Sequence, residues 1–313
     1  MNIKGIAINA DAGLIDGSLK VLDRELTYFR EIGFSHVELS PHGAGAIYCG
    51  RLNPERLRDI RGLLENYSFG YTVHGPNPLN LMNNGKDSVD REGFIASIEF
   101  TAAVGAGILV YHAGRYLGEE DFMLVPRPYP SKNKQQTLWL QEREALREMG
   151  EIAARNGVAI AVENARPYSD APRYCYAESL EKLAEMVKQV GHPNVGITLD
   201  FGHAYLASRH YGFDLFEGLA AVAPLVKHIH LHDNFGRSST SYERKQYEMA
   251  AMGRGDMHMP IGWGEVPARE MLALLPHYSG VLTLELRPRY RENCREALAA
   301  ARRLVTENER CAS

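Results

Sequence analysis

The chain has 313 residues, of which 45% are hydrophobic and 24% are charged, and its formal net charge is -4 at pH 7. This is the balance of an ordinary globular protein, so the composition excludes a disordered chain, and no apolar stretch is long enough to predict a membrane-spanning helix. The net charge gives no broad basic field of the kind that holds a nucleic-acid backbone, so nucleic acid is not the expected partner.

The N-terminal segment and the cysteines bear on the compartment and the redox chemistry of the protein. The N-terminal segment MNIKGIAINADAG has neither a long apolar run nor a small-residue cleavage site, which predicts a first strand and a cytoplasmic protein. The four cysteines, Cys49, Cys175, Cys294 and Cys311, have no CxxC spacing. They therefore suggest neither a disulfide framework nor a thiolate zinc site, and any metal must use other ligands.

Eight short apolar runs, rich in Ile, Val, Leu and Tyr, are predicted to be strands. They cover residues 5–10, 36–41, 69–75, 107–113, 158–163, 195–200, 226–232 and 280–286. Nearly all are followed by a segment with helical periodicity and charges on one side. These segments cover residues 20–32, 54–66, 91–104, 141–156, 178–190, 215–223 and 268–275, with a last helix from about residue 294.

Strands that alternate with helices predict a parallel sheet, and eight such units in this length favour one closed (β/α)8 barrel that spans residues 1–313 as a single domain. The first strand is not followed by a G-x-G-x-x-G motif, so a dinucleotide-binding fold has no positive support. Three long segments, 114–140, 164–177 and 233–267, are predicted loops at the C-terminal ends of strands. Active sites of barrels are built on that face.

Histidines and carboxylates gather at these predicted strand ends. The set consists of His74, His112, Glu163, Asp200, His203, His230 and Glu285, with Asp256 and His258 in the loop after the seventh strand. A lone histidine at a strand end is more often a hydrogen-bonded rim residue than a ligand. The whole set is different, because carboxylates that converge on one rim would repel each other unless a cation lay between them. Nitrogen and oxygen ligands suit zinc, manganese, cobalt or iron, and their number suffices for one to three ions.

The remaining histidines are interpreted by their position. His228 and His232 alternate with His230, so all three share one face of a strand. His228 is predicted to fill a lower layer of the barrel, and His232 to support the ligands or contact substrate. The other histidines, His36, His42, His192, His210 and His277, lie in predicted loops or at helix ends and are predicted to be solvated.

Other candidates for substrate binding are cationic or aromatic. Arg287 stands two residues after Glu285, so strand alternation places it on the same face, where it would orient Glu285 or a substrate carboxylate. Arg237, in the long loop after the seventh strand, would close over a phosphate or acidic group, although such residues more often solvate a loop. Trp263 would form an apolar wall of the pocket, although packing in the interior is the commoner use of this residue.

The sequence resembles the xylose isomerase-like barrel superfamily, which includes sugar isomerases, epimerases and the endonuclease IV family. The most specific motifs are HGPNPLNL, ENA, LDFGHA, HLHDN and DMHMPIGWGE. The resemblance implies a metal-binding quartet of Glu163, Asp200, His230 and Glu285. It also implies that the further ligands of the endonuclease IV family correspond to His74, His112, His203, Asp256 and His258.

The resemblance implies a metal-dependent isomerase or epimerase of a sugar, sugar phosphate or polyol ketone. Glu163 and Glu285 would abstract and return a proton while the metal stabilises an enediolate, and His203 would assist as a ligand or stabilise a substrate oxygen. The expected partner is thus a small sugar or polyol, and a homo-oligomer is compatible with this reading.

Two alternatives stay open. An endonuclease IV-like phosphodiesterase (an AP endonuclease) would use the same ligands to activate water, but no aromatic residue follows His74 in the motif HGPNP and no contiguous basic surface is visible. A catalytically silent barrel that binds metal or sugar is the other alternative. The intact set of carboxylates and histidines argues against it.

Overall fold

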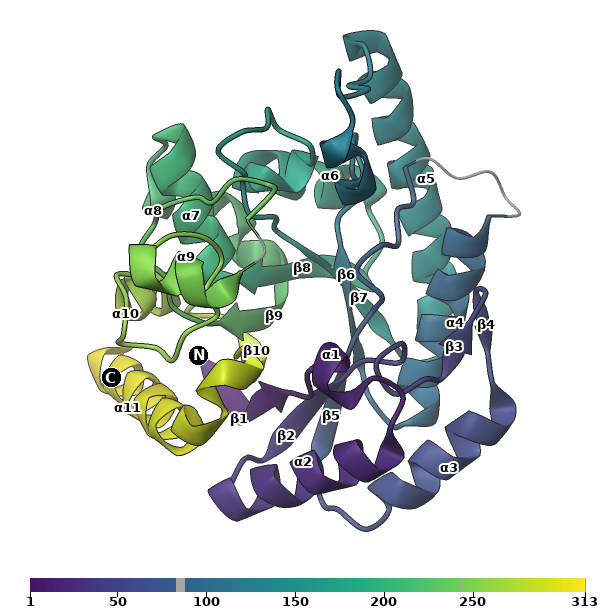
Figure 1. The fold of residues 1–313 in the computed structure, drawn as a ribbon, viewed down its shortest axis with the longest axis vertical. Coiled ribbons are helices and arrows are strands. Elements are labelled where there is room, and N and C mark those ends of the chain that lie inside the picture. Colours follow the sequence, from purple (N-terminus) through teal and green to yellow (C-terminus); the bar gives the residue numbers. More distant parts are fainter. Residues whose placement is uncertain (83–87, 244, 313) are drawn as a thin grey trace.

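Eight parallel strands close into a barrel in the computed structural model, which describes residues 1–82, 88–243 and 245–312. The strands are β1 (Asn2–Asn9), β2 (His36–Leu39), β5 (Gly70–His74), β6 (Ile108–His112), β7 (Ala159–Glu163), β8 (Val195–Asp200), β9 (Val226–Leu231) and β10 (Ser279–Leu284). Around the barrel they follow the order β1-β10-β9-β8-β7-β6-β5-β2 (Figure 1). The predicted (β/α)8 barrel is confirmed, and each predicted strand overlaps an observed one.

Helices surround the barrel (Figure 1). They are α1 (Ala12–Ile15), α2 (Leu19–Ile32), α3 (Pro54–Leu64), α4 (Val89–Ala103), α5 (Lys132–Arg155), α6 (Leu180–Val190), α7 (Phe201–Tyr211), α8 (Leu215–Val222), α9 (Gln246–Met252), α10 (Ala268–Ala273) and α11 (Cys294–Ala312). Short 3-10 helices are η1 (Glu119–Met123), η2 (Tyr176–Glu178), η3 (Ala223–Leu225) and η4 (Pro288–Asn293). A small hairpin of β3 (Ile47–Tyr48) and β4 (Arg51–Leu52) follows β2. None of the described helices is long and apolar enough to cross a membrane.

Side-chain caps fix where several helices begin. Ser18 accepts the N–H of Val21 at the start of α2, and Asn53 accepts the N–H groups of Glu55 and Arg56 at the start of α3. Ser131 does the same for α5, where it accepts the N–H of Lys134. Each cap satisfies N–H groups that have no partner inside the helix.

Three features at the C-terminal ends of the strands differ from the prediction. The segment 233–267 was predicted to be a loop, but it contains the short helix α9. The segment 114–140 was predicted to be a loop, but α5 begins at Lys132 because Ser131 caps it. The helix α7 was not predicted at all. It starts directly at the end of β8, where the carboxylate of Asp200 accepts the N–H of His203 at 2.7 Å. Because most residues in its first two turns are buried, α7 lacks the polar face that makes a helix visible in sequence.

The register of the sheet brings the strand ends to one level. His112 at the end of β6 lies opposite Glu163 at the end of β7, and Asp200 at the end of β8 lies opposite His230 in β9. The buried apolar side chains Ile8, Val73 and Ile160 lie on the opposite face of their strands from the ligands and pack toward the surrounding helices. Polar side chains at the upper level therefore face one another across the mouth of the barrel.

Candidate metal centre

Four predicted ligands from four strands form one compact group. Ligand atoms of Glu163, Asp200, His230 and Glu285 all lie within 4.8 Å of one another. The Nδ1 atom of His230 lies 3.2 Å from Oε1 of Glu163 and 3.4 Å from Oε2 of Glu285. The two glutamates thus approach the same imidazole nitrogen from β7 and from the end of β10.

A second group lies beside the first. It contains His203, His232, Asp256 and His258, again with ligand atoms within 4.8 Å of one another. Oδ2 of Asp256 lies 3.2 Å from Nε2 of His203 and 2.8 Å from Nε2 of His258. His258 has a φ of 45°, a left-handed conformation that is uncommon for a residue with a side chain. Such conformations cluster at functional sites, where surrounding contacts hold them.

His74 and His112 complete the predicted set on the opposite side of Glu163. Their Nε2 atoms lie 3.5 Å and 3.0 Å from Oε2 of Glu163, and the two rings meet edge to face with centroids 4.9 Å apart. The structure therefore brings together all nine residues predicted as ligands.

Three histidines are oriented as metal ligands usually are. Nδ1 of His74 bonds the carbonyl oxygen of Gly75 at 2.8 Å, Nδ1 of His203 bonds that of Asn164 at 2.9 Å, and Nδ1 of His258 bonds that of Glu285 at 3.0 Å. Because a carbonyl can only accept, each Nδ1 must be the protonated donor. Each Nε2 is therefore the atom that can donate a lone pair to a metal ion bound among the carboxylates, the arrangement that outer partners impose on metal-binding histidines.

The carboxylates carry oxygen atoms that the protein does not satisfy. Oε2 of Glu163, Oδ1 of Asp256 and Oε2 of Glu285 are buried but accept no hydrogen bond from any described residue. A buried carboxylate oxygen without a donor is costly. A divalent cation would supply the missing partner of these three oxygens, so the donor set fits a metal centre.

The ionisation of the cluster follows from its charges. Burial raises the pKa of Glu163, but the imidazoles of His112 and His230 outweigh it and hold the pKa well below its usual range. Burial lowers the pKa of His74, but Glu163 reverses the effect and raises it to about 9. Burial also lowers the pKa of His203, whereas Asp200 and Asp256 raise it to about 10. The carboxylates are thus kept ionised by neighbouring positive charge, which protons or metal ions can provide.

One buried carboxylate of this level was missed in the sequence. Glu38 within β2 has its Oε1 3.0 Å from Nε2 of His230 and its Oε2 2.9 Å from Nε2 of His228. Thr72 donates a hydrogen bond to the same Oε2 at 2.9 Å. A charged residue inside the apolar run HVEL was the signal that could have identified it. His228 is fully buried in the layer below His230, where the sequence placed it.

A polar cavity of about 290 Å³ opens beside His74 and Glu285. His42 lines it, so the prediction of a solvated surface histidine was wrong for this residue. Burial lowers the pKa of His42 to about 4. His210 and His277 are exposed, whereas His36 and His192 are half-buried.

Arg287 lines the same cavity, and its Nε atom is buried without a hydrogen-bond partner among the described residues. The other substrate candidates lie elsewhere. Arg237 is exposed, and Trp263 is 41% exposed and donates its Nε1–H to Glu296 at 2.8 Å. His232 is fully buried and lies 3.1 Å from Asp200, inside the second group of ligands. Of these four residues, the geometry favours only Arg287 as a contact for substrate.

A smaller cavity lies on the other side of the cluster, beside His112, Glu163 and His203. Two arginines that the sequence did not single out line it. Nε of Arg166 lies 3.5 Å from Oδ2 of Asp256, and Arg115 is buried near the start of the loop after β6. No spacing rule could have selected them, because both depend on how two loops fold over the strand ends.

Comparison with known proteins agrees with this architecture. Residues 26–305 match the family described as "Xylose isomerase-like TIM barrel". An uncharacterised protein of Methanocaldococcus jannaschii, MJ1311, is 27% identical over 240 residues, which cover 75% of this chain and 70% of that protein.

Solved structures with the same fold include sugar epimerases. A D-tagatose 3-epimerase-like protein has 20% identity and a TM-score of 0.72, with 99% of this chain and 100% of that chain covered. An L-ribulose 3-epimerase has 14% identity and a TM-score of 0.69, with 100% and 97% covered. The 3-keto-D-glucoside 4-epimerase YcjR of E. coli has 17% identity and a TM-score of 0.65, with 95% and 98% covered. At these identities the likeness is one of fold.

Proposed function

The chain belongs to the xylose isomerase-like TIM barrel family, and we propose that it is a divalent-metal-dependent isomerase or epimerase of a small sugar or polyol ketone. One observation carries the proposal. The buried Glu163 at the end of β7 and the half-buried Glu285 directly after β10 reach the same nitrogen of His230 at 3.2 Å and 3.4 Å. Such a pair can move a proton to and from a carbon that lies between them.

We propose that the catalytic ion is zinc or manganese and that it is held by Glu163, Asp200, His230 and Glu285. A divalent ion bound there would attract two neighbouring oxygens of the substrate and stabilise the negative charge that develops on them. Glu163 and Glu285 are both ionised, because positively charged neighbours hold their pKa values low. One carboxylate abstracts the proton from the carbon next to the carbonyl. For epimerisation the other first takes up a proton from solvent and then, as the acid, delivers it to the opposite face of that carbon; for isomerisation the abstracting residue passes its own proton to the neighbouring carbon.

Further residues of the chain complete the proposed site. His203 lies between the two ligand groups, 3.6 Å from Glu163 and 3.2 Å from Asp256, where it would hold a second ion or stabilise a substrate oxygen. Arg287 would bind an acidic substituent of the substrate in the cavity beside Glu285. His232 is best explained as a ligand or as a support for Asp200, since its ring is fully buried.

A phosphodiesterase related to the endonuclease IV family is the second candidate, and a specific observation favours it. The group of His203, His232, Asp256 and His258 would hold an additional ion that a single-metal epimerase does not need. Two or three ions could activate a water and neutralise an attacked phosphate. We rank this function below sugar epimerisation, because the cavity beside the cluster is lined by amides and carboxylates as well as by Arg287.

The test combines metal content with turnover. Protein purified without a metal-affinity tag is analysed for metal per chain, and then assayed with D-tagatose, L-ribulose, D-psicose and a duplex with an abasic site. In D2O, an epimerase incorporates solvent deuterium at the carbon that loses its proton, and a phosphodiesterase does not. Glu163→Gln and Glu285→Gln are expected to lower turnover by about 10²-fold or more each and to weaken metal binding only in part.

The matched control is Glu265→Gln, which removes an exposed carboxylate from the loop after β9. It is expected to leave turnover unchanged. Full activity in the Glu163→Gln and Glu285→Gln double variant would contradict proton transfer by this pair. Cleavage of the abasic duplex without any ketose conversion would support the second candidate.

A further inference from the structure

A second cavity, of about 540 Å³, lies outside the barrel between α5, α6 and the segment 173–176. We call it the α5–α6 cavity. None of the nine predicted ligands lines it, so it is separate from the metal centre. Its volume lies in the range of roughly 300 to 1,000 Å³ that small-molecule sites usually have.

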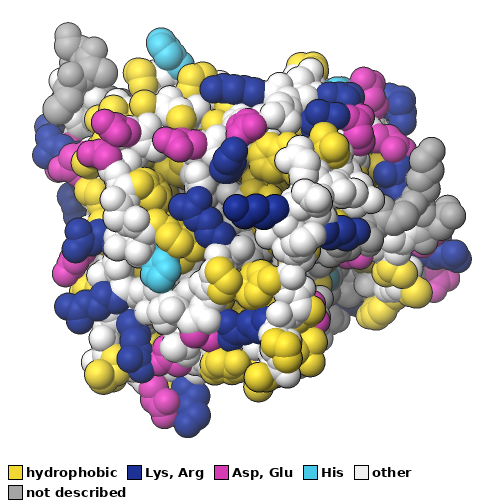
Figure 2. Space-filling view, turned by 90° about the horizontal axis from the view of Figure 1, so that it is seen from above, with side chains coloured by type: hydrophobic (Ala, Val, Ile, Leu, Met, Phe, Trp, Pro, Cys, Tyr) yellow, Lys and Arg dark blue, Asp and Glu magenta, His cyan; other side chains and the backbone are white. Residues whose placement is uncertain are grey.

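Positive side chains converge on the α5–α6 cavity. It is lined by Lys132, Arg143, Arg173 and Lys182, and by one carboxylate, that of Glu185. Figure 2, which views the molecule from the side of α5, α6 and α8, shows Lys and Arg side chains gathered across the middle of that face. Because the chain as a whole is acidic, with a net charge of -4, this concentration of positive charge is local.

The few carboxylates near the cavity leave part of this charge uncompensated. Lys182 pairs with Glu185 at 2.7 Å, and Arg143 pairs with Glu144 at 2.7 Å. Lys132 and Arg173 form no ion pair with any carboxylate in the described part of the chain. Arg173 is instead held over the ring of Tyr211, at 4.3 Å from its centroid, and its charge also opposes the rise that burial causes in the pKa of the nearby Glu178.

The floor of the cavity is aromatic and rigid. Trp139 is 7% exposed and donates its Nε1–H to Gln189 at 3.0 Å, and its ring meets that of Tyr176 edge to face at 5.2 Å between centroids. Leu140 on the next position of α5 is exposed and lines the same cavity. Nζ of Lys182 lies 5.9 Å from the centroid of the Trp139 ring, so aromatic surface and positive charge adjoin in this cavity. This combination suits a ligand that has both a ring and an anionic group.

We propose that the α5–α6 cavity binds a phosphorylated small molecule. Lys132 and Arg173 bind its phosphate through charge-assisted hydrogen bonds, and the body of the ligand lies against Trp139 and Leu140. A phosphate is favoured over a carboxylate because its oxygens can accept from several cations at once, and Lys132 and Arg173 line this cavity without an ion pair to a described carboxylate.

The location of the cavity makes it a candidate for control of the metal centre. Cys175 lines both the α5–α6 cavity and the small cavity beside His112 and Glu163. The wall between them is a bridge in which Arg115 pairs with Cys175, and the N–H of Tyr116 donates to the carbonyl of Tyr174 at 2.7 Å. A ligand on the outer side therefore contacts the segment whose inner side faces the proposed ligands. The expectation that it alters turnover rests on the proposed function, whereas binding itself does not.

Binding is tested by calorimetric titration of the metal-loaded protein with AMP, glucose 6-phosphate and inorganic phosphate, and with adenosine as the uncharged probe. AMP or glucose 6-phosphate is expected to bind in a saturable way and more tightly than phosphate alone, and adenosine is expected to bind at least about tenfold more weakly than AMP. The double variant Lys132→Gln, Arg173→Gln is expected to lower the affinity at least about tenfold while its metal content stays that of the wild type.

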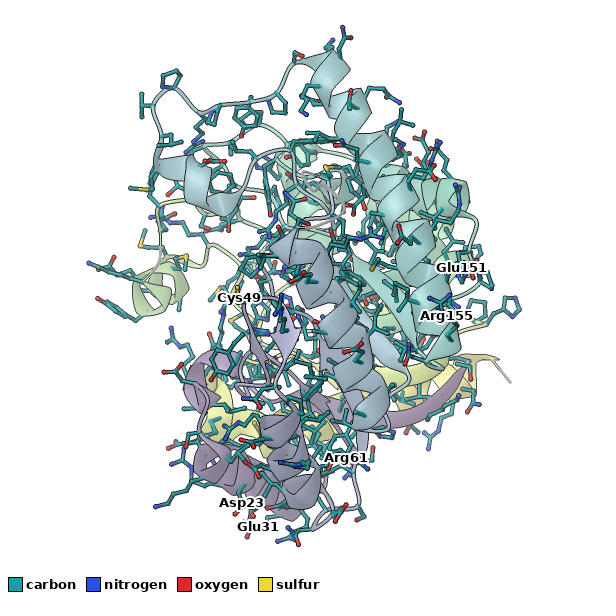
Figure 3. The ribbon with its side chains drawn as sticks, turned by 90° about the vertical axis from the view of Figure 1, so that its right-hand side faces the viewer. Asp23, Glu31, Cys49, Arg61, Glu151 and Arg155 are labelled. Carbon is teal, nitrogen blue, oxygen red and sulfur yellow. The ribbon has the colours of Figure 1, made fainter. Side chains whose placement is uncertain are left out.

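The control variant is Arg155→Gln, which removes one positive charge from the opposite end of α5, where Figure 3 labels this residue. It is expected to bind the probes as the wild type does. Absence of saturable binding for all three phosphorylated probes would overturn the proposal. Binding that survives in the double variant would also overturn the proposal, since the probe then binds at the metal centre. The same holds if Arg155→Gln weakens binding as much as the double variant does. If the wild-type protein binds AMP in this cavity but has no epimerase activity, the proposed function is refuted and the proposed binding site is not.

Discussion

Glu142→Gln is expected to make the protein more stable than wild type at pH 8 and about equally stable at pH 5. The carboxyl of Glu142 in α5 is fully buried, accepts the N–H of Gly114 at 3.0 Å, and lies 3.3 Å and 3.4 Å from the hydroxyls of Tyr176 and Tyr111. Burial raises the pKa of Glu142 from 4.5 to about 7, although these hydrogen bonds and Arg115 oppose it. Glu142 thereby holds the loop that carries Arg115 after the end of β6.

The sign and size of the effect follow from proton linkage. Because the folded pKa lies above the unfolded one, the folded state binds the proton more tightly. The resulting stability is present in full below about pH 4.5 and is lost as the pH rises through about 7. The difference corresponds to about 3 kcal/mol in the free energy of unfolding. Glutamine has the shape of the protonated acid and does not titrate, so Glu142→Gln removes this loss.

Thermal unfolding of wild type and Glu142→Gln is measured in parallel from pH 5 to pH 8 at fixed metal concentration. Titration of the metal centre affects both proteins alike, so the difference between their unfolding midpoints reports the contribution of Glu142 alone. Glu151→Gln is the control. Glu151 belongs to the same helix, its side chain is 64% exposed, and Figure 3 labels it. Parallel pH profiles for wild type and Glu142→Gln would refute the reasoning, since the carboxyl would then be ionised in the folded protein.

Two further predictions concern the site itself. His74→Ala removes a ring whose Nε2 lies 3.5 Å from Oε2 of Glu163. We expect elemental analysis to show the loss of about one ion per chain, while the ion held by Glu163, Asp200, His230 and Glu285 remains. An unchanged metal content would show that His74 is structural. Arg287→Gln is expected to raise KM about tenfold or more for a ketose with a carboxylate or phosphate and to leave KM for the neutral ketose unchanged, in steady-state kinetics. Equal effects on both substrates would argue that Arg287 only orients Glu285.

The barrel could be predicted because its strands are buried on both sides and therefore appear as continuous apolar runs. The prediction for residues 195–200 coincides with β8, all of whose residues are buried. The start of α5 was missed because the segment 132–137 is polar, and its helical state depends on the cap by Ser131. Helix α7 was missed for the opposite reason, since its first turns are buried among other elements.

Most of the ligands could be predicted because strand ends in a closed barrel meet at one level whatever the loops do. Asp256 and His258 lie in the loop after β9 and were predicted from the motif DMHMPIGWGE. Glu38 was missed although it obeys the same rule, because it stands within the short strand β2 and its partner His230 lies far away in sequence. His42 and Arg166 could not be predicted, since both reach the centre from loops. Strand positions follow from periodicity, whereas loop positions follow from contacts that form only in the fold.

The choice between the two proposed chemistries depends on the surroundings of the ligands rather than on the ligands. The same carboxylates and histidines would serve a ketose or a phosphodiester. The cavity beside Glu285 is lined by Asn9, Asp11 and Asn77, whose groups are suited to hydroxyls, and the carboxylate of Asp11 would repel a phosphate backbone. Arg287 is the arginine of this cavity, and its Nε donates to no described residue; one such cation suffices for one acidic substituent but not for a nucleic-acid strand. The lining therefore favours a small polyhydroxylated ketone with at most one anionic end.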